Sequence, residues 1–264
     1  MNLKARDIIL ALSVRCHGEW KDIYEIVVKK IQFTDEEFQK EILKEKAPFF
    51  AITDDEYPDY FKSVYQPPFL LYYYGNLDIL NKGPRLTVVG TRKPNDYQNE
   101  VLPRLLKECF AKMKKKVVLV SGMAEGIDSL AMRTAMEEQI PVIGILGSGI
   151  DNPYPESSKD IYEFCKSGKG IVLSEYPLKS KPLADHFTFR NRLLAACGQV
   201  VFVAGGKNRS GTSSTARQAL EQGKDILALP CNITGDDLTN TLIRDGARPV
   251  LESLDLCEAL KDFS

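Results

Sequence analysis

Histidine is scarce in this chain, and its cysteines show no pattern typical of a metal site. The 264 residues include two histidines, His17 and His186, which lie far apart in the sequence. The six cysteines form no C-x-x-C pair, the spacing typical of zinc sites and redox centres. We therefore expect no metal site. A Ser-His-Asp triad is also disfavoured, because His17 is remote from the loops discussed below and His186 has only its sequence neighbour Asp185 beside it.

Long apolar runs are missing as well. No stretch approaches the ~18–20 apolar residues that a helix needs to cross a bilayer. The beginning, MNLKARDIILAL, lacks the long apolar core and the small-residue cleavage site of a secretory signal peptide. We therefore expect a cytoplasmic protein that does not enter a membrane and whose cysteines are reduced and mostly buried.

Two nucleotide-binding motifs are absent or incomplete. The segment VVGTRKPND lacks the G-x-G-x-x-G pattern of dinucleotide-binding proteins. Gly206 and Gly211 have the spacing of a P-loop, but Thr212 stands where the phosphate-binding lysine belongs. The sequence thus argues against dinucleotide binding and against nucleoside triphosphate hydrolysis, and we expect no cofactor.

The chain does contain a regular alternation of apolar runs and helical segments. From Arg85 onwards, six short apolar runs end in small or polar residues and are separated by helix-like segments. Strands that are buried on both faces and alternate with helices are typical of a parallel, doubly wound α/β sheet. Pro103 indicates the start of the first of these helices. We predict a small helical module at residues 1–48 and a mainly parallel α/β domain at residues 49–264.

Cations and glycine turns gather where the predicted strands end. The net charge is −1, but residues 181–220 contain six basic residues and one acidic residue. Ligands of doubly wound sheets bind at the carboxyl ends of the strands, where glycine loops and helix N-termini expose amides that suit phosphate oxygens. Aromatic residues lie among the cations, and such rings can stack on exposed bases. The pattern predicts a track for several phosphates, formed by Arg92, Ser121, Gly122, Gly126, Arg190, Asn191, Arg192, Lys207, Arg209, Ser210, Gly211 and Thr212, with Tyr154 and Phe187 as candidates for base stacking.

Some of these residues have a structural alternative. Arg190 or Arg192 can pair with Asp128 or Glu175 and brace the loops, and the glycines can serve tight turns alone. Asp128 lies near a helix start expected at Ile127, which is more typical of a cap or brace than of a catalytic acid. In addition, Phe187 and Phe189 alternate as in a strand, so we expect at least one of them in the core.

Seven segments, in order along the chain, resemble the DNA-processing protein A family (DprA, also called Smf). They include VVGTRKP, SGMAEGIDSLAM, FTFRNRLLA and TNTLIRDGA, and the resemblance runs from about Ala51 to Leu251. It implies an extended Rossmann-like fold that binds single-stranded DNA as a homodimer, helps to load the RecA recombinase during transformation, and has no enzymatic activity. The residues that it implies for gripping a backbone phosphate are Arg92, Ser121, Gly122, Arg190, Arg192, Lys207, Ser210, Gly211 and Thr212.

The chain departs from the family pattern at several places. Ala204 stands where members commonly have a glutamate, and Phe187-Thr188 stand where Phe-Pro often precedes the arginine pair. Many members carry a C-terminal winged-helix domain, and because this chain stops at Ser264 we expect none here.

Two other functions stay open. Nucleoside-monophosphate phosphoribohydrolases have a related fold and a P-G-G-x-G-T-x-x-E signature, but Thr215 stands at the glutamate position. A sensor that binds one small nucleotide would need a closed pocket and would bind with weak salt dependence.

The segment RPVLESLDLCEAL near the C-terminus offers an apolar face with two possible roles. It can form a contact between two copies of the chain, or it can pack on the sheet of its own chain. The leucines of the expected dimer contact are Leu251, Leu254, Leu256 and Leu260.

Overall fold

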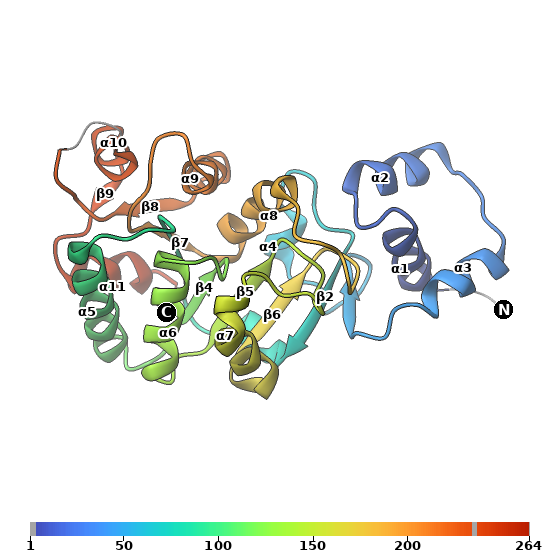
Figure 1. The fold of residues 1–264 in the computed structure, drawn as a ribbon, viewed down its shortest axis with the longest axis horizontal. Helices are drawn as coiled ribbons and strands as arrows, with labels where there is room; N and C mark the ends of the chain where they lie inside the picture. The colour runs from blue at the N-terminus through green and yellow to red at the C-terminus, as the bar shows by residue number, and fades with distance from the viewer. Residues whose placement is uncertain (1–3, 234–236, 264) are drawn as a thin grey trace.

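The centre of the molecule is one nine-stranded sheet. The computed structural model describes residues 4–233 and 237–263 (Figure 1). The strand order is β1-β2-β6-β5-β4-β3-β7-β8-β9; β1, β2 and β6 pair antiparallel, and all other neighbours pair parallel. The strands are β1 (Phe49–Ala51), β2 (Leu70–Gly75), β3 (Arg85–Val89), β4 (Val118–Ser121), β5 (Val142–Leu146), β6 (Ile171–Ser174), β7 (Val200–Val203), β8 (Asp225–Ala228) and β9 (Arg248–Pro249).

The parallel part of the sheet is doubly wound, as the sequence predicts. The chain starts in the middle with β3, builds outward through β4, β5 and β6, and then returns to the other side of β3 with β7 and β8. The order of the strands therefore reverses between β3 and β7, whose carboxyl ends lie side by side in parallel register. This reversal is the point at which doubly wound sheets bind their ligands.

Helices cover both faces of the sheet (Figure 1). The first face carries α5 (Asp96–Lys112), α6 (Ile127–Glu137), α7 (Lys159–Phe164), which continues as a π-turn at Cys165–Lys169, and α11 (Ser253–Lys261). The opposite face carries α4 (Asp59–Lys62), the 3-10 turn Leu77–Asn81, α8 (Ala184–Cys197), α9 (Gly211–Glu221) and α10 (Leu238–Arg244). A further 3-10 turn, Glu156–Ser158, precedes α7.

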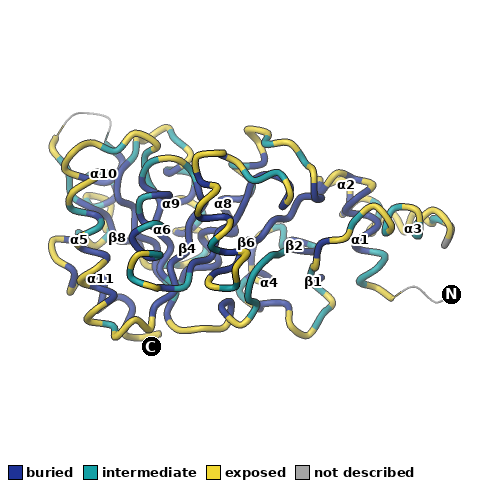
Figure 2. Tube along the Cα trace, turned by 60° about the horizontal axis from the view of Figure 1, so that its bottom comes forward, coloured by how far each residue is buried: buried dark blue, intermediate teal, exposed yellow. Residues whose placement is uncertain are grey.

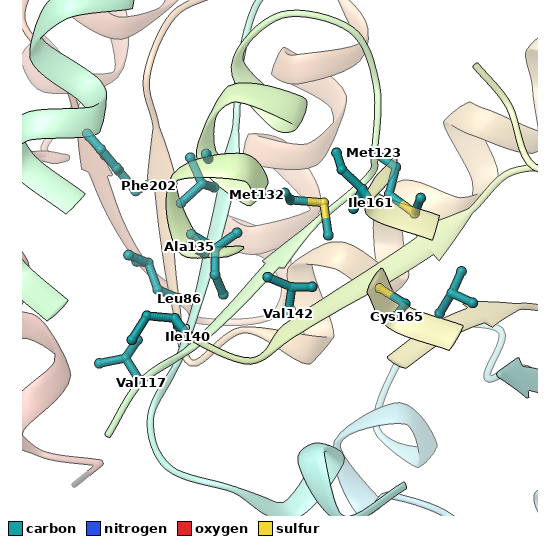
Figure 3. Close-up of a cluster of buried hydrophobic side chains, with 14 of the residues drawn as sticks. Leu86, Val117, Met123, Met132, Ala135, Ile140, Val142, Ile161, Cys165 and Phe202 are labelled. Carbon is teal, nitrogen blue, oxygen red and sulfur yellow. The ribbon is translucent and has the colours of Figure 1, made fainter. Parts of the chain in front are cut away.

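Alternate residues of each strand supply the two cores. Leu86 and Val88 of β3 belong to the core under α5 and α6, whereas Val89 belongs to the core under α8 and α9. Figure 3 shows the first core, with Met132 of α6 over Val142 of the sheet. Burial of both strand faces explains why these strands read as continuous apolar runs.

Two predictions of local secondary structure differ from the structure. The expectation that the first helix begins at Pro103 is wrong, because α5 begins at Asp96, where Asn95 and Gln98 form a capping box. The strand-like interpretation of Phe187 and Phe189 is also wrong, because both lie in α8. Two residues along a helix turn the side chain by about 200°, so the rings point to different neighbours: Phe187 contacts Tyr154, and Phe189 lies under Arg192.

The chain before β1 forms α1 (Ala5–Arg15), α2 (Trp20–Lys29) and α3 (Asp35–Ile42). Thr34 and Glu37 form a capping box at the start of α3. Leu10 and Val14 of α1 join the main core, while the outer sides of α2 and α3 are exposed (Figure 2). None of the helices that the structure describes is long and apolar enough to cross a membrane.

The C-terminal leucines divide into two pairs. Leu256 and Leu260 have no exposed surface and belong to the core, where α11 packs against α5. They are therefore occupied within their own chain, and the expectation that they contact a second copy is corrected. Leu251 is 75% exposed and Leu254 is 38% exposed, so these two side chains remain accessible for contact with a second copy of the chain.

Candidate nucleic-acid interface

A groove of about 730 Å³ lies at the carboxyl ends of β3 and β7, and we call it the switch-point groove. Its walls are the loop after β3, the first turns of α8, and the loop from β7 into α9. It brings together eight residues of the predicted phosphate track and both candidates for base stacking: Arg92, Arg190, Asn191, Lys207, Arg209, Ser210, Gly211, Thr212, Tyr154 and Phe187. The sequence prediction of one shared edge thus holds for most of the set.

Three cations stand at the rim of the groove. Arg92, Lys207 and Arg209 are exposed, and none forms an ion pair within residues 4–233 and 237–263. Exposed cations without an acidic partner attract polyanions at long range, and this attraction weakens as salt screens it.

The start of α9 offers backbone amides to the same space. The Ser210 side chain accepts a hydrogen bond from the Ser213 amide at 3.3 Å, which forms the cap, while the amides of Gly211 and Thr212 have no acceptor in the described part of the chain. The loop is held in place because Thr212 Oγ1 donates to the Gly90 carbonyl at 2.9 Å and Asn191 Nδ2 donates to the Gly211 carbonyl at 3.1 Å. Free amides at a helix N-terminus are a favourable site for an anion.

The floor of the groove is a buried charge network. Arg190 is 5% exposed; its Nη1 donates to the carbonyl of Gly122 at 3.1 Å and to that of Ile145. Asp128, which is also buried, accepts from the Gly122 amide at 3.1 Å. A Cβ on Gly122 would lie 2.7 Å from Arg190 Nη2 and 2.8 Å from Asp128 Oδ2, so this position needs glycine.

Burial changes the protonation of both floor groups. It lowers the pKa of Arg190 to about 10, although the nearby Asp128 opposes this, so the guanidinium stays charged at neutral pH. Burial also raises the pKa of Asp128, while Arg190 and the Gly122 amide act in the opposite direction. The fixed hydrogen bonds indicate a bracing role for this pair, as the structural alternative in the sequence analysis anticipates.

Two rings form the outer wall. Tyr154 is 46% exposed, and its ring centroid lies 5.8 Å from that of Phe187 at an angle of 57°. Together with Arg92, Gly122 and Ala124 they also line a small recess that opens beside the groove. The wall therefore offers ring surface next to the rim cations, which is the arrangement that stacked bases require.

Four residues of the predicted phosphate track do not line the groove: Gly122, which borders the small recess, and Ser121, Gly126 and Arg192. Ser121 is fully buried, and its Oγ donates to the Val88 carbonyl at 2.7 Å. Gly126 has a φ of +80°, and a Cβ there would lie 2.4 Å from the Thr91 carbonyl oxygen, so it serves the packing of two loops. The Ile127 amide donates to that same carbonyl at 3.1 Å, so this amide at the start of α6 is already bonded within the protein.

Arg192 is the fourth, and it faces away from the groove. Its Nη2 donates to both carboxylate oxygens of Glu175, at 2.7 Å and 2.9 Å, and its Nε donates to the Gln66 carbonyl at 3.0 Å. Both side chains of the ion pair are buried. The expected alternative, in which one arginine of this motif pairs with Glu175, is confirmed.

Some residues of the groove were not predicted from the sequence. Thr91 and Thr188 line it, as does Asp128, which was weighed only as a cap or brace. Thr91 lies two residues after the end of β3, at the carboxyl edge of the sheet, and could have been found from that position. Thr188 could not, because its position depends on the early start of α8.

Comparisons with known proteins agree with this architecture. The family model described as DNA recombination-mediator protein A matches residues 48–261. The chain is 34% identical to DNA processing protein DprA of Bacillus subtilis over 215 residues, which is 80% of this chain and 70% of that protein. It is 35% identical to DprA of Streptococcus pneumoniae over 227 residues, which is 85% of this chain and 78% of that protein.

Two solved structures are similar over most of their length. The X-ray structure of DprA from Streptococcus pneumoniae superposes with a TM-score of 0.79 at 29% identity and covers 99% of both chains. A structure of DNA processing protein A from Helicobacter pylori, reported for its mode of single-stranded DNA binding, has a TM-score of 0.72 at 28% identity and covers 83% of this chain and 98% of that one. The matches in sequence and in structure agree, and the chain belongs to the DNA recombination-mediator protein A family, that of DprA and Smf.

Proposed function

We propose that this chain binds single-stranded DNA along the switch-point groove, without a catalytic step. The observation that carries the proposal is the convergence, in one groove, of three exposed cations and two amides at the start of α9 that have no ion-pair partner or acceptor among the described residues. Backbone phosphates bind Arg92, Lys207, Arg209 and these amides, while bases rest against Tyr154 and Phe187. Family membership supports the same role, because the Helicobacter pylori relative is described as binding single-stranded DNA.

Binding of this kind has little sequence preference. The cations and amides contact phosphates, which are the same at every nucleotide, and stacking on a ring tolerates every base. The groove is open at the surface, so a strand can enter and leave at its ends, whereas a sensor for one small nucleotide would enclose its ligand.

The test is fluorescence anisotropy with a labelled ~20-nucleotide oligo-dT at ~50 and ~200 mM salt, with unlabelled duplex as competitor. We expect binding that weakens strongly with salt and that duplex does not displace. Absence of binding at both salt concentrations would contradict the proposal.

The alternative function, hydrolysis of nucleoside monophosphates, lacks the glutamate of the hydrolase signature. Thr215 stands at the position of the hydrolase glutamate; it is buried, and its Oγ1 donates to the Gly211 carbonyl at 3.4 Å. Asp128 lines the groove, but its carboxylate already accepts a hydrogen bond from the Gly122 amide. Incubation with the common nucleoside monophosphates should release no base, and release of base would favour the hydrolase.

We also propose that the bound strand is passed to a RecA-type recombinase in the cytoplasm. The proposal rests on the family membership. It predicts that the protein speeds the assembly of RecA on single-stranded DNA coated with a single-strand-binding protein, and that Arg92→Ala loses this effect together with DNA binding.

Two further proposals concern organisation. Residues 1–48 form a module distinct from residues 49–264, and two copies of the chain associate through the exposed leucines Leu251 and Leu254. A dimer would place two switch-point grooves on one particle. Limited proteolysis near residue 48 tests the first proposal; the second is tested by sedimentation, as described in the Discussion.

A further inference from the structure

A second groove, of about 750 Å³, lies on the other side of the α8 N-terminus, and we call it the α2–α8 groove. Its walls come from the start of α2, the loop before β2, α8, and the outer side of α9. Ala184 and Thr188 line both grooves, and both residues are exposed. The two grooves are thus separated only by a ridge of small side chains, over which an extended strand can pass.

The loop before β2 is anchored while its ring stays free. The Gln66 carbonyl accepts from Arg192 Nε at 3.0 Å, and the Pro67 carbonyl accepts from Trp20 Nε1 at 2.7 Å. Tyr65, the residue before these two anchors, is 82% exposed and forms no hydrogen bond or ring contact with any residue that the structure describes. A rigid loop therefore holds a large ring in the open at the edge of the groove.

The charge of this groove differs from that of the switch-point groove. Its exposed cations, Lys21 and Arg217, are offset by Asp185 and by Glu19, whose carboxylate lies 3.1 Å from His186 Nε2. Arg192 lines the groove but is neutralised by Glu175. A nearly neutral wall attracts phosphates weakly, whereas rings and side chains such as Gln218 and Ser214 suit nucleobases.

We propose that the α2–α8 groove binds the bases of a DNA strand that leaves the switch-point groove over the ridge at Ala184 and Thr188, with Tyr65 as a stacking platform. This inference rests on the proposed function. It gives Arg192 a positioning role, because the arginine holds the loop that carries Tyr65. The two grooves then have different roles: the switch-point groove binds phosphates, and the α2–α8 groove lengthens the bound segment of DNA by stacking on its bases.

The test compares two lengths of oligo-dT, ~5 and ~20 nucleotides, since single-strand-binding sites span about 4–16 nucleotides. The charged switch-point groove binds the short strand, and only the long strand reaches both grooves. We expect Tyr65→Ala to weaken binding of the long strand about fivefold or more, at ~50 and at ~200 mM salt alike, because the lost interaction is stacking. Binding of the short strand should stay at the parental value.

Two controls accompany this comparison. Tyr65→Phe keeps the ring and should bind both lengths like the parent. Arg104→Ala removes an exposed cation from α5, on the opposite face of the sheet, and should also leave binding of both strand lengths at the parental value. Tyr65 is exposed, so its variants should unfold at the parental temperature.

The single tryptophan provides a direct signal. Trp20 lines the α2–α8 groove, and the chain has no other tryptophan. Saturation with the long strand should quench its emission, and saturation with the short strand should not.

The possible outcomes separate the two proposals. If the parent binds neither length, the proposed function fails, and this inference fails with it. If the parent binds both lengths but Tyr65→Ala does so equally well and Trp20 emission is unchanged, DNA binding stands and the inference about the second groove is overturned. If Tyr65→Ala weakens binding of the short and the long strand equally, Tyr65 belongs to the switch-point groove, and the inference is also overturned.

Discussion

The floor and the rim of the switch-point groove use the same residue types for opposite purposes. Arg190 at the floor and Arg192 behind it are buried, and both donate hydrogen bonds to other groups of the protein. At the rim, Arg92 and Arg209 are exposed and form no ion pair in the described part of the chain. The buried arginines, which are already hydrogen-bonded within the protein, shape the site. The exposed arginines remain accessible to a ligand.

The difference follows from the cost of burying a charge. A buried guanidinium is tolerated only when carboxylates or carbonyls satisfy it, so its partners are fixed when the chain folds. An exposed guanidinium keeps its water and gives it up only when a phosphate arrives. Substitutions at the floor should therefore change the free energy of unfolding, and substitutions at the rim should change DNA affinity.

The largest effect on stability should come from Arg192→Ala. This substitution leaves the buried Glu175 without its bidentate partner, and breaking a buried pair in this way costs about 3–5 kcal/mol. Urea denaturation followed by circular dichroism measures the change. Lys29→Ala removes an exposed ion pair with Glu25 and should leave the unfolding midpoint unchanged. If the two variants unfold at similar urea concentrations, the buried ion pair contributes no more to stability than the exposed one, and the distinction between buried and exposed charge breaks down.

Two glycines, one that borders the recess and one that lines the groove, sharpen the comparison. Gly122→Ala brings a Cβ against Arg190 and Asp128, and such overpacking typically costs about 1–3 kcal/mol. Gly211→Ala is the matched control, because a Cβ there would meet nothing within 4 Å. We expect a lower melting temperature for the first variant and a parental one for the second. Equal melting temperatures would mean that the Arg190 side chain can move aside freely.

Much of this arrangement was predictable from the sequence, because local patterns determine it. The continuous apolar runs predicted the parallel strands, and the cations and glycine turns that follow these runs predicted the edge of the sheet at which the groove lies. Parallel strands bring their carboxyl ends to one edge whatever their order, so the loops after β3 and β7 could be placed on that edge from the sequence. That the two loops adjoin follows from the strand order.

What the sequence could not give was the direction of individual side chains. Arg190 and Arg192 belong to one short motif, but neighbours two apart on a helix point about 200° away from each other. Their different roles appear only once α8 is known to begin at Ala184. In the same way, the pattern of the C-terminal leucines could not show that Leu256 and Leu260 face α5, because an apolar stripe looks the same whether its partner is the same chain or another.

Rim substitutions should affect binding alone. Arg92→Ala and Lys207→Ala should each weaken binding of oligo-dT for every sequence tested and lower the slope of log K against log salt by about one unit, because each removes one phosphate contact. Their unfolding should match the parent. Arg104→Ala, an exposed cation far from the groove, controls for the loss of one positive charge. Parental affinity and salt slope in both rim variants would contradict the assignment of the groove.

The smallest change in stability is expected at Leu254, where the contrast between buried and exposed residues recurs within α11. Leu254→Glu changes a side chain that is 38% exposed and should alter the free energy of unfolding by no more than about 0.5 kcal/mol. Leu260→Ala, its buried counterpart, should cost about 2–5 kcal/mol. In sedimentation we expect the parent to be a dimer and Leu254→Glu a monomer, because a carboxylate in an apolar contact cannot be solvated. A folded Leu254→Glu variant with the parental mass would show that exposure at this position serves no contact between copies.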